Sequence, residues 1–169
     1  GGYKAFRNYL IHETERSIGR FKPIVLGGRT GSGKTILLKK LQNAIDLEGL
    51  ANHRGSSFGR KIIPQPTQIN FENALAYELI QKLDKGFEHL VLEDEGKNVG
   101  SVYIPKPLGA YLAEAPRVIL ETSTQERVET TFKEYVLEAQ QMYKAAGFDD
   151  PLRAWQEDIQ KAMDRIMKR

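Results

Sequence analysis

Hydrophobic and polar positions along this chain predict short strands that alternate with helices. Compact apolar runs, the pattern of strands in a sheet covered on both faces, occur at 23–26, 44–47, 87–92, 102–104 and 117–121. Helical spacing of apolar residues occurs at 3–17, 36–41, 70–83 and 107–115. The alternation predicts an α/β fold with a mostly parallel sheet and helices on both faces.

The pattern also predicts one buried helix face, two helix N-caps and one buried strand. In the first helix the predicted buried face consists of Tyr3, Phe6, Leu10 and, at its edge, Tyr9. Asn70 and Thr124 are the predicted N-caps of two later helices. The strand at 117–121 is predicted to be buried, because it is nearly continuous in apolar residues.

The carboxyl-terminal part of the chain predicts a pair of helices. One runs from 131 to 146 and ends at Gly147, and the next begins at Asp150-Pro151, since proline is favoured in the first turn of a helix. The second helix carries an apolar stripe made of Leu152, Trp155, Ile159, Met163 and Ile166. We therefore expect a P-loop α/β domain at 1–130 and a helical hairpin at 131–169 that leans on it.

Residues 28–35 match the pattern G-x-x-x-x-G-K-[ST], with an apolar run before it and helical spacing after it. This is the P-loop, in which backbone amides surround a phosphate, the lysine reaches the outer phosphates and the hydroxyl binds Mg²⁺. The fold expected is thus P-loop NTPase-like. The predicted phosphate-binding residues are Gly28, Arg29, Thr30, Gly31, Ser32, Gly33, Lys34 and Thr35.

The apolar run at 87–92 ends in Glu93, Asp94 and Glu95. An acid at the carboxyl end of a strand downstream of a P-loop holds Mg²⁺ or its waters in P-loop enzymes. We predict a metal site formed by Thr35 and Asp94, with Glu93 as the second choice of acid. Lys34 and Asp94 are predicted to be catalytic.

Residues 46–59 form a polar, glycine-rich segment that we interpret as a second wall of the substrate site. Asp46, Glu48 and Arg54 complete the predicted catalytic set. The two acids are expected to handle metal or proton chemistry, and Arg54 to bind a phosphate or carboxylate. The other predicted substrate-binding residues are His53, Ser56, Ser57 and Arg127. An ordinary surface loop remains the alternative interpretation of this segment.

Ligands of parallel α/β sheets bind beyond the carboxyl ends of the strands. This rule brings together the P-loop, the segment after Leu47, the acids after Leu92 and the loop after Glu121. It predicts one cleft formed by all four.

Composition limits the possible functions of the chain but does not identify one. The chain has 169 residues, no cysteine, 40% hydrophobic residues, and a net charge of +3 with a pI of about 9.0. Disulfides and cysteine nucleophiles are therefore excluded within these residues, and the mild positive charge permits RNA binding without requiring it. No apolar run is long enough for a membrane span, so we expect a cytoplasmic protein.

The chain resembles the carboxyl-terminal half of the tRNA 2-selenouridine synthases. The resemblance is carried by Gly1–Arg7, the P-loop, the string from Asp46 to Gly59, and Gln65-Pro66-Thr67-Gln68 with Phe71-Glu72. It covers most of residues 1–130. The Asp46–Gly59 string is its most specific part.

The resemblance implies a transferase that acts on 2-thiouridine at the wobble position of tRNA. It implies geranylation of that sulfur by geranyl diphosphate, followed by replacement of the geranylated sulfur with selenium from selenophosphate. Members of the family also carry an amino-terminal rhodanese domain with a catalytic cysteine. We therefore expect this chain to be an excised fragment whose partners are tRNA, the phosphorylated donor and that rhodanese domain, with Mg²⁺ as cofactor and a nucleotide as a possible ligand.

Two other functions are compatible with the same residues. A small-molecule or nucleoside kinase predicts nucleoside triphosphate turnover that depends on Lys34. A non-catalytic RNA-binding module predicts tRNA binding that weakens steeply with salt and does not depend on Asp94.

Overall fold

A parallel sheet forms the centre of the protein in the computed structural model, which describes residues 2–54, 58 and 61–168. Its strands are β1 (Lys22–Gly27), β2 (Ala44–Ile45), β3 (His89–Glu93) and β6 (Arg117–Ile119), in the spatial order β2-β3-β1-β6. All the pairings are parallel. The prediction of a mostly parallel α/β sheet of the P-loop NTPase type is confirmed.

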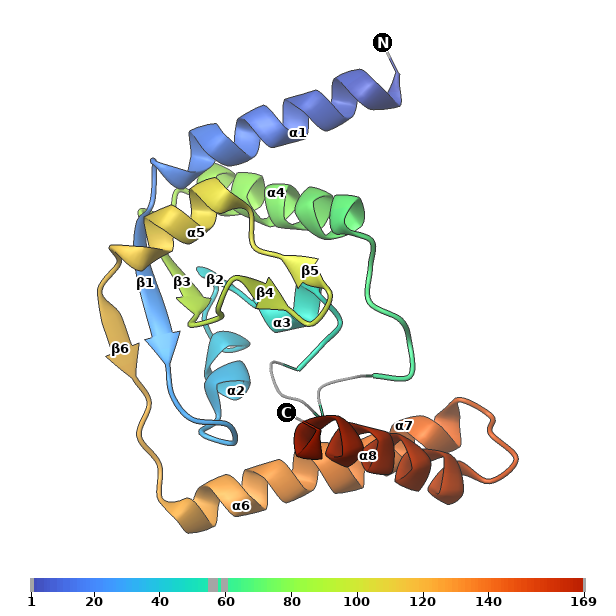
Figure 1. The fold of residues 1–169 in the computed structure, drawn as a ribbon. Coiled ribbons are helices and arrows are strands. Elements are labelled where there is room, and N and C mark those ends of the chain that lie inside the picture. The colour runs from blue at the N-terminus through green and yellow to red at the C-terminus, as the bar shows by residue number, and fades with distance from the viewer. Residues whose placement is uncertain (1, 55–57, 59–60, 169) are drawn as a thin grey trace.

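Long helices cover one face of this sheet, whereas the short helix after the P-loop packs on the opposite face through Leu38. On one side lie α1 (Tyr3–Ile18), α4 (Gln68–Asp84) and α5 (Lys106–Ala113), where α1 crosses over α4 (Figure 1). The short α2 (Lys34–Leu38) lies near the ends of the strands. A small antiparallel hairpin, β4 (Asn98–Val99) with β5 (Val102–Tyr103), replaces the single strand predicted at 102–104.

The hydrophobic core has two clusters, and alternate side chains of β3 point into one or the other. Leu90 and Leu92 belong to the larger cluster, which includes Phe71, Leu75 and Leu79 of α4. Val91 faces the opposite way and packs with Leu26 and Leu38 in a smaller cluster. Successive side chains of a strand point to opposite faces, so the two clusters fill the two sides of the sheet.

The predicted buried face of the first helix is correct at Leu10 and wrong at its three aromatic positions. Tyr3, Phe6 and Tyr9 are more than half exposed, whereas Leu10, Glu13, Thr14, Ser17 and Ile18 are buried. α1 lies along the outer side of α4, to which Arg7 bonds through Glu72 and Asn73, and its first turns extend past the end of α4 (Figure 1). Only its last turns therefore reach the core.

Two predicted helix starts are shifted. Thr67, not Asn70, caps α4, because its hydroxyl accepts a hydrogen bond from the backbone N–H of Asn70. Ser123, not Thr124, caps α6 (Thr124–Phe132), and it forms a capping box with Glu126. Serine and threonine at the N-cap accept from the amide three residues on, so a candidate inside the first turn is easily mistaken for the cap.

The segment after Ile45 is not simply a polar loop. It contains the one-turn helix α3 (Leu47–Leu50), and Leu47 and Ala51 are fully buried. Asn52 then adopts a left-handed conformation with φ 47°, and its side-chain amide donates to the carbonyl of Ile63. The segment is therefore held in place by the buried side chains of α3 and by the hydrogen bond from Asn52.

The strand predicted as buried at 117–121 is an exposed edge strand. Val118 and Ile119 of β6 are 54% and 57% exposed, because β6 is the outermost strand beside β1. Its apolar character therefore does not indicate burial.

The carboxyl-terminal helices form a long arm. α6 runs directly into a π-helical segment η1 (Lys133–Glu138) and α7 (Ala139–Ala145), so the helical run begins at 124 rather than 131. α8 (Pro151–Met167) begins where predicted, with Asp150 accepting from the N–H of Arg153, and packs alongside α7 (Figure 1). Leu152, Met163 and Ile166 of the predicted stripe are 40–50% exposed.

Among the described residues, no helix is both long and apolar enough to cross a membrane.

Replacement of Leu75 tests the assignment of the core to α4. Leu75→Ala removes a fully buried side chain and should lower the free energy of unfolding by about 2–5 kcal/mol, measured by urea denaturation. Tyr77→Ala on the same helix removes a side chain that is 60% exposed and should change it by less than about 0.5 kcal/mol. Equal losses for the two variants would contradict this packing.

Candidate functional site

The P-loop connects β1 to α2 and depends on three glycines. Gly28, Gly31 and Gly33 have φ of 149°, 78° and 87°, a region that other residues enter only at a cost. A side chain at Gly28 would lie 2.7 Å from the Ser32 hydroxyl, and one at Gly31 would lie 2.5 Å from the carbonyl oxygen of Arg127. The loop is therefore held tightly from both sides.

The polar groups of the loop turn toward its centre. Lys34 Nζ donates to the carbonyl of Gly28 at 2.8 Å and so spans the loop. The Ser32 hydroxyl is buried and has no hydrogen-bond partner among the described residues. A bound phosphate would give the Ser32 hydroxyl the partner that it lacks among these residues and would offer Lys34 further acceptor oxygens.

A cleft of about 880 Å³ opens in front of the P-loop. The predicted residues that line it are Gly28, Thr30, Gly31, Ser32, Gly33, Lys34, Thr35, Asp46, Glu48, His53, Arg54 and Asp94. Residues 129–138 of α6 and η1 contribute the opposite wall through Glu129, Thr130, Lys133, Glu134, Tyr135 and Glu138. Three of the four segments predicted to meet at the carboxyl ends of the strands thus line one cleft, and the helix that follows the loop after Glu121, rather than that loop, supplies the fourth wall.

Three carboxylates gather at one side of this cleft. Glu48, Glu93 and Glu95 each offer an oxygen within 4.8 Å of the others. Glu93 is almost completely buried, and its Oε1 accepts from the backbone N–H of Glu48 at 2.6 Å. Its Oε2 is buried without a hydrogen-bond partner in the part of the chain that is described.

The environment of these acids favours their neutral forms. Burial raises the pKa of Glu93 to about 8, against the opposing hydrogen bond from the Glu48 amide. Burial also raises the pKa of Glu95 to about 7, and the neighbouring Glu48 adds to that rise. Crowded carboxylates are stabilised either by a shared proton or by a cation.

A divalent cation fits this donor set. Mg²⁺ prefers carboxylate, hydroxyl and water oxygens, and the unpartnered Oε2 of Glu93 is a donor of that kind. Thr35 lines the same cleft. The residues that could hold the ion are therefore Glu48, Glu93 and Glu95, with Thr35 on the phosphate side.

Asp94, the acid that the sequence favoured as the metal ligand, does not belong to this group of carboxylates. It is 42% exposed and forms an ion pair with Arg117, with Nε 3.6 Å from Oδ2. It lines the cleft but is outside the three-carboxylate group. Sequence reasoning did not select Glu95, although the period of two along a strand places Glu93 and Glu95 on one side.

Asp46 has a structural task as well as a place in the cleft. Its Oδ1 accepts from the N–H of Gly49 at 2.6 Å, which caps α3. A side chain at Gly49 would meet the Asp46 carboxylate at 2.5 Å. Asp46 thus positions the amide of Glu48 that contacts Glu93.

Arg54 joins this segment to the carboxyl-terminal arm. Its guanidinium donates to the carbonyl of Glu134, lies 3.5 Å from the Glu138 carboxylate, and lies 5.1 Å from the centre of the Tyr135 ring. His53 beside it is buried. Both line the cleft, whereas Ser56 and Ser57 lie outside the described residues.

Two predicted residues lie apart from the cleft wall. Arg127 donates from Nε to the carbonyl of Thr30 at 3.1 Å, so its side chain holds the outside of the P-loop. Arg29 is exposed and does not line the cleft. Lys39 and Lys61 do line it, although neither is among the predicted site residues.

Comparison with known proteins decides the family. Residues 21–169 match the family described as the tRNA 2-selenouridine synthase AAA domain. The chain belongs to this family. The resemblance seen in the sequence is thereby confirmed.

Relatives of the family extend well beyond this chain. A tRNA 2-selenouridine synthase of Sulfurovum sp. is 70% identical over 169 residues, and one of Hydrogenovibrio crunogenus is 48% identical over 174 residues. One of Pseudomonas aeruginosa is 42% identical over 170 residues. Each comparison covers the whole of this chain but 46% of the relative. No solved structure matches the chain.

The buried carboxyl of Glu93 predicts a pH dependence of stability. Its pKa is raised from 4.5 to about 8 in the folded protein, so its contribution to stability is full below pH 4.5 and is lost as the pH rises toward 8. Glu93→Gln should therefore flatten the fall in the free energy of unfolding between about pH 5 and 8, measured by urea denaturation in EDTA.

Glu88→Gln is the matched control, because Glu88 is an exposed acid just before the same strand. An unchanged pH profile in Glu93→Gln would show that Glu93 is charged in the folded protein.

Proposed function

We propose that this chain is the phosphate-binding part of a tRNA-modifying transferase that converts wobble 2-thiouridine to 2-selenouridine. The observation that carries the proposal is the single cleft in which the P-loop amides, Lys34 and three carboxylates meet. The family membership and the names of the relatives supply the tRNA substrate class.

In the proposed first step the P-loop binds the diphosphate of geranyl diphosphate. The sulfur of 2-thiouridine forms a bond to C1 of the geranyl group while the bond from C1 to the diphosphate oxygen breaks, and N3 of the base gives up its proton. Lys34 and the loop amides stabilise the negative charge that develops on the leaving diphosphate. A divalent cation at the carboxylate group would neutralise further charge on that diphosphate.

The second donor, selenophosphate, would use the same phosphate site: selenium forms a bond to C2 of the uridine, the bond from C2 to sulfur breaks and geranylthiol leaves, and water cleaves the phosphorus–selenium bond to release phosphate. Arg54 and Lys61 at the far wall of the cleft provide positive charge for the backbone of the tRNA. The rhodanese domain of the complete enzyme remains the proposed partner for the cysteine-dependent chemistry, since the chain has no cysteine.

Calorimetry on the 169-residue chain tests the phosphate site. In Mg²⁺ buffer, geranyl diphosphate and selenophosphate should bind, and Lys34→Ala should weaken their binding by about 10- to 100-fold because a charge-assisted contact is lost. Lys40→Ala is the control, since Lys40 is exposed and does not line the cleft.

ATP and GTP are titrated under the same conditions. Tighter binding of either nucleotide than of geranyl diphosphate would overturn the proposed donor and favour a kinase.

A further inference from the structure

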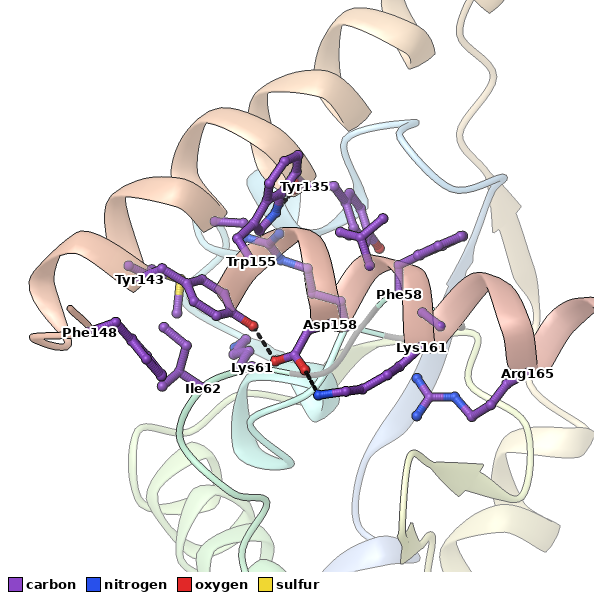
Figure 2. Close-up of a pocket in the computed structure, with 15 residues that line it drawn as sticks. Phe58, Lys61, Ile62, Tyr135, Tyr143, Phe148, Trp155, Asp158, Lys161 and Arg165 are labelled. Atoms are coloured by element: carbon purple, nitrogen blue, oxygen red, sulfur yellow. Dashed lines mark hydrogen bonds and ion pairs between the residues drawn. The ribbon is translucent and has the colours of Figure 1, made fainter. Parts of the chain in front are cut away.

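A second, smaller cavity lies between the carboxyl-terminal arm and the loop that follows α3. Its volume is about 240 Å³, and it is lined mainly by apolar and aromatic side chains. Figure 2 shows Tyr143 and Phe148 at one end and Arg165 at the other, with Trp155 between them. Ile62, Met142 and Ile159 also line the cavity.

Several polar groups beside the aromatic part of this cavity have partners within the protein, and Arg54, Lys61 and Arg165 add positive charge to its wall. The Tyr143 hydroxyl donates to Oδ2 of Asp158 at 2.6 Å, and Lys161 Nζ donates to Oδ1 at 3.0 Å (Figure 2). The Trp155 indole N–H donates to the carbonyl of Tyr135 at 3.2 Å. Because these groups already have partners, an apolar occupant loses less here than a polar one.

The cavity adjoins the P-loop cleft. Arg54, Lys61 and Tyr135 line both spaces, so one ligand can reach from one to the other past these three side chains. Lys61 is half-buried, and burial together with the nearby Arg54 lowers its pKa. An anionic head group in the cleft would stabilise the charged form of this lysine.

We propose that this cavity holds the hydrocarbon tail of the ligand whose phosphorylated head binds at the P-loop. The inference rests on the proposed function and deepens it, since it places the hydrocarbon chain of that ligand and names the residues that select the chain. Tyr135 and Arg54 mark the junction between head and tail. Trp155, Ile159 and Met142 contact the chain.

An extruded nucleobase is the competing occupant, because aromatic side chains also stack on bases. Base recognition additionally requires hydrogen-bonding groups directed at the base edge. Asp158 and Tyr143 satisfy each other instead. The observations therefore favour a hydrocarbon chain.

A ligand series tests the tail pocket. Inorganic diphosphate, dimethylallyl diphosphate and geranyl diphosphate are titrated into the chain with Mg²⁺. Burial of each methylene contributes about fourfold to affinity, so geranyl diphosphate should bind at least about tenfold more tightly than inorganic diphosphate. Trp155 is the single tryptophan of the sequence, and its fluorescence should respond to the prenyl ligands and not to inorganic diphosphate.

Ile159→Asn places a polar group in the pocket and should remove most of the gain from the chain while leaving inorganic diphosphate binding unchanged. Leu152→Asn is the matched control on the same helix, because Leu152 is 50% exposed and does not line the pocket. Met142→Gln is a second pocket variant at a partly exposed position, so a folding defect in Ile159→Asn does not decide the result.

The outcomes separate the two proposals. If inorganic diphosphate does not bind, the proposed phosphate site fails. If it binds and the chain adds no affinity, or if Ile159→Asn and Met142→Gln weaken all ligands equally, the tail pocket fails alone. A response of Trp155 to an anticodon stem-loop containing 2-thiouridine, in the absence of a response to the prenyl diphosphates, would assign the pocket to the base and overturn the inference.

Discussion

The parallel register of β1 with β3 is the constraint on which the site depends. Leu26 lies opposite Glu93, and the N–H of Asp94 donates to the carbonyl of Leu26. The two strands therefore end at the same level, so the P-loop and the acidic turn leave the sheet side by side. A shift of this register by one residue would turn Glu93 to the other face of the sheet and separate it from Glu48.

The second constraint on the site is the burial of an ionisable side chain, Glu93. Glu93 is buried among apolar residues and beside two further carboxylates, a placement that costs stability unless a proton or a cation compensates it. Only one of its oxygens has a described hydrogen-bond partner, the Glu48 amide. A structure that retains such a group at the edge of a phosphate-binding loop is typical of sites whose chemistry needs a poised carboxylate.

The carboxyl-terminal arm completes the cleft although it adds little to the core. Arg54 reaches it through Glu134, Tyr135 and Glu138, and Arg127 reaches back to the carbonyl of Thr30. These contacts place η1 across from the P-loop, and the same segment separates the phosphate cleft from the apolar cavity. The arm is thus a wall of the binding site and not only a packed appendage.

The sequence by itself determined the elements whose signals are local. The P-loop glycines, the strand before them and the cap at Asp150 each follow from short-range backbone preferences, and the parallel sheet follows from the alternation of strands and helices. Convergence of the P-loop, the segment after Leu47 and the acids after Leu92 on one cleft also followed, because parallel strands share one carboxyl edge.

Tertiary structure alone decided the rest. Whether Tyr3 and Phe6 are buried depends on how far α1 extends past α4, and Ile119 is exposed because β6 has a neighbour on one side only. The partnership of Glu93 with Glu48 and Glu95, while Asp94 pairs with Arg117, depends on contacts between residues distant in the chain, and no local pattern encodes such contacts.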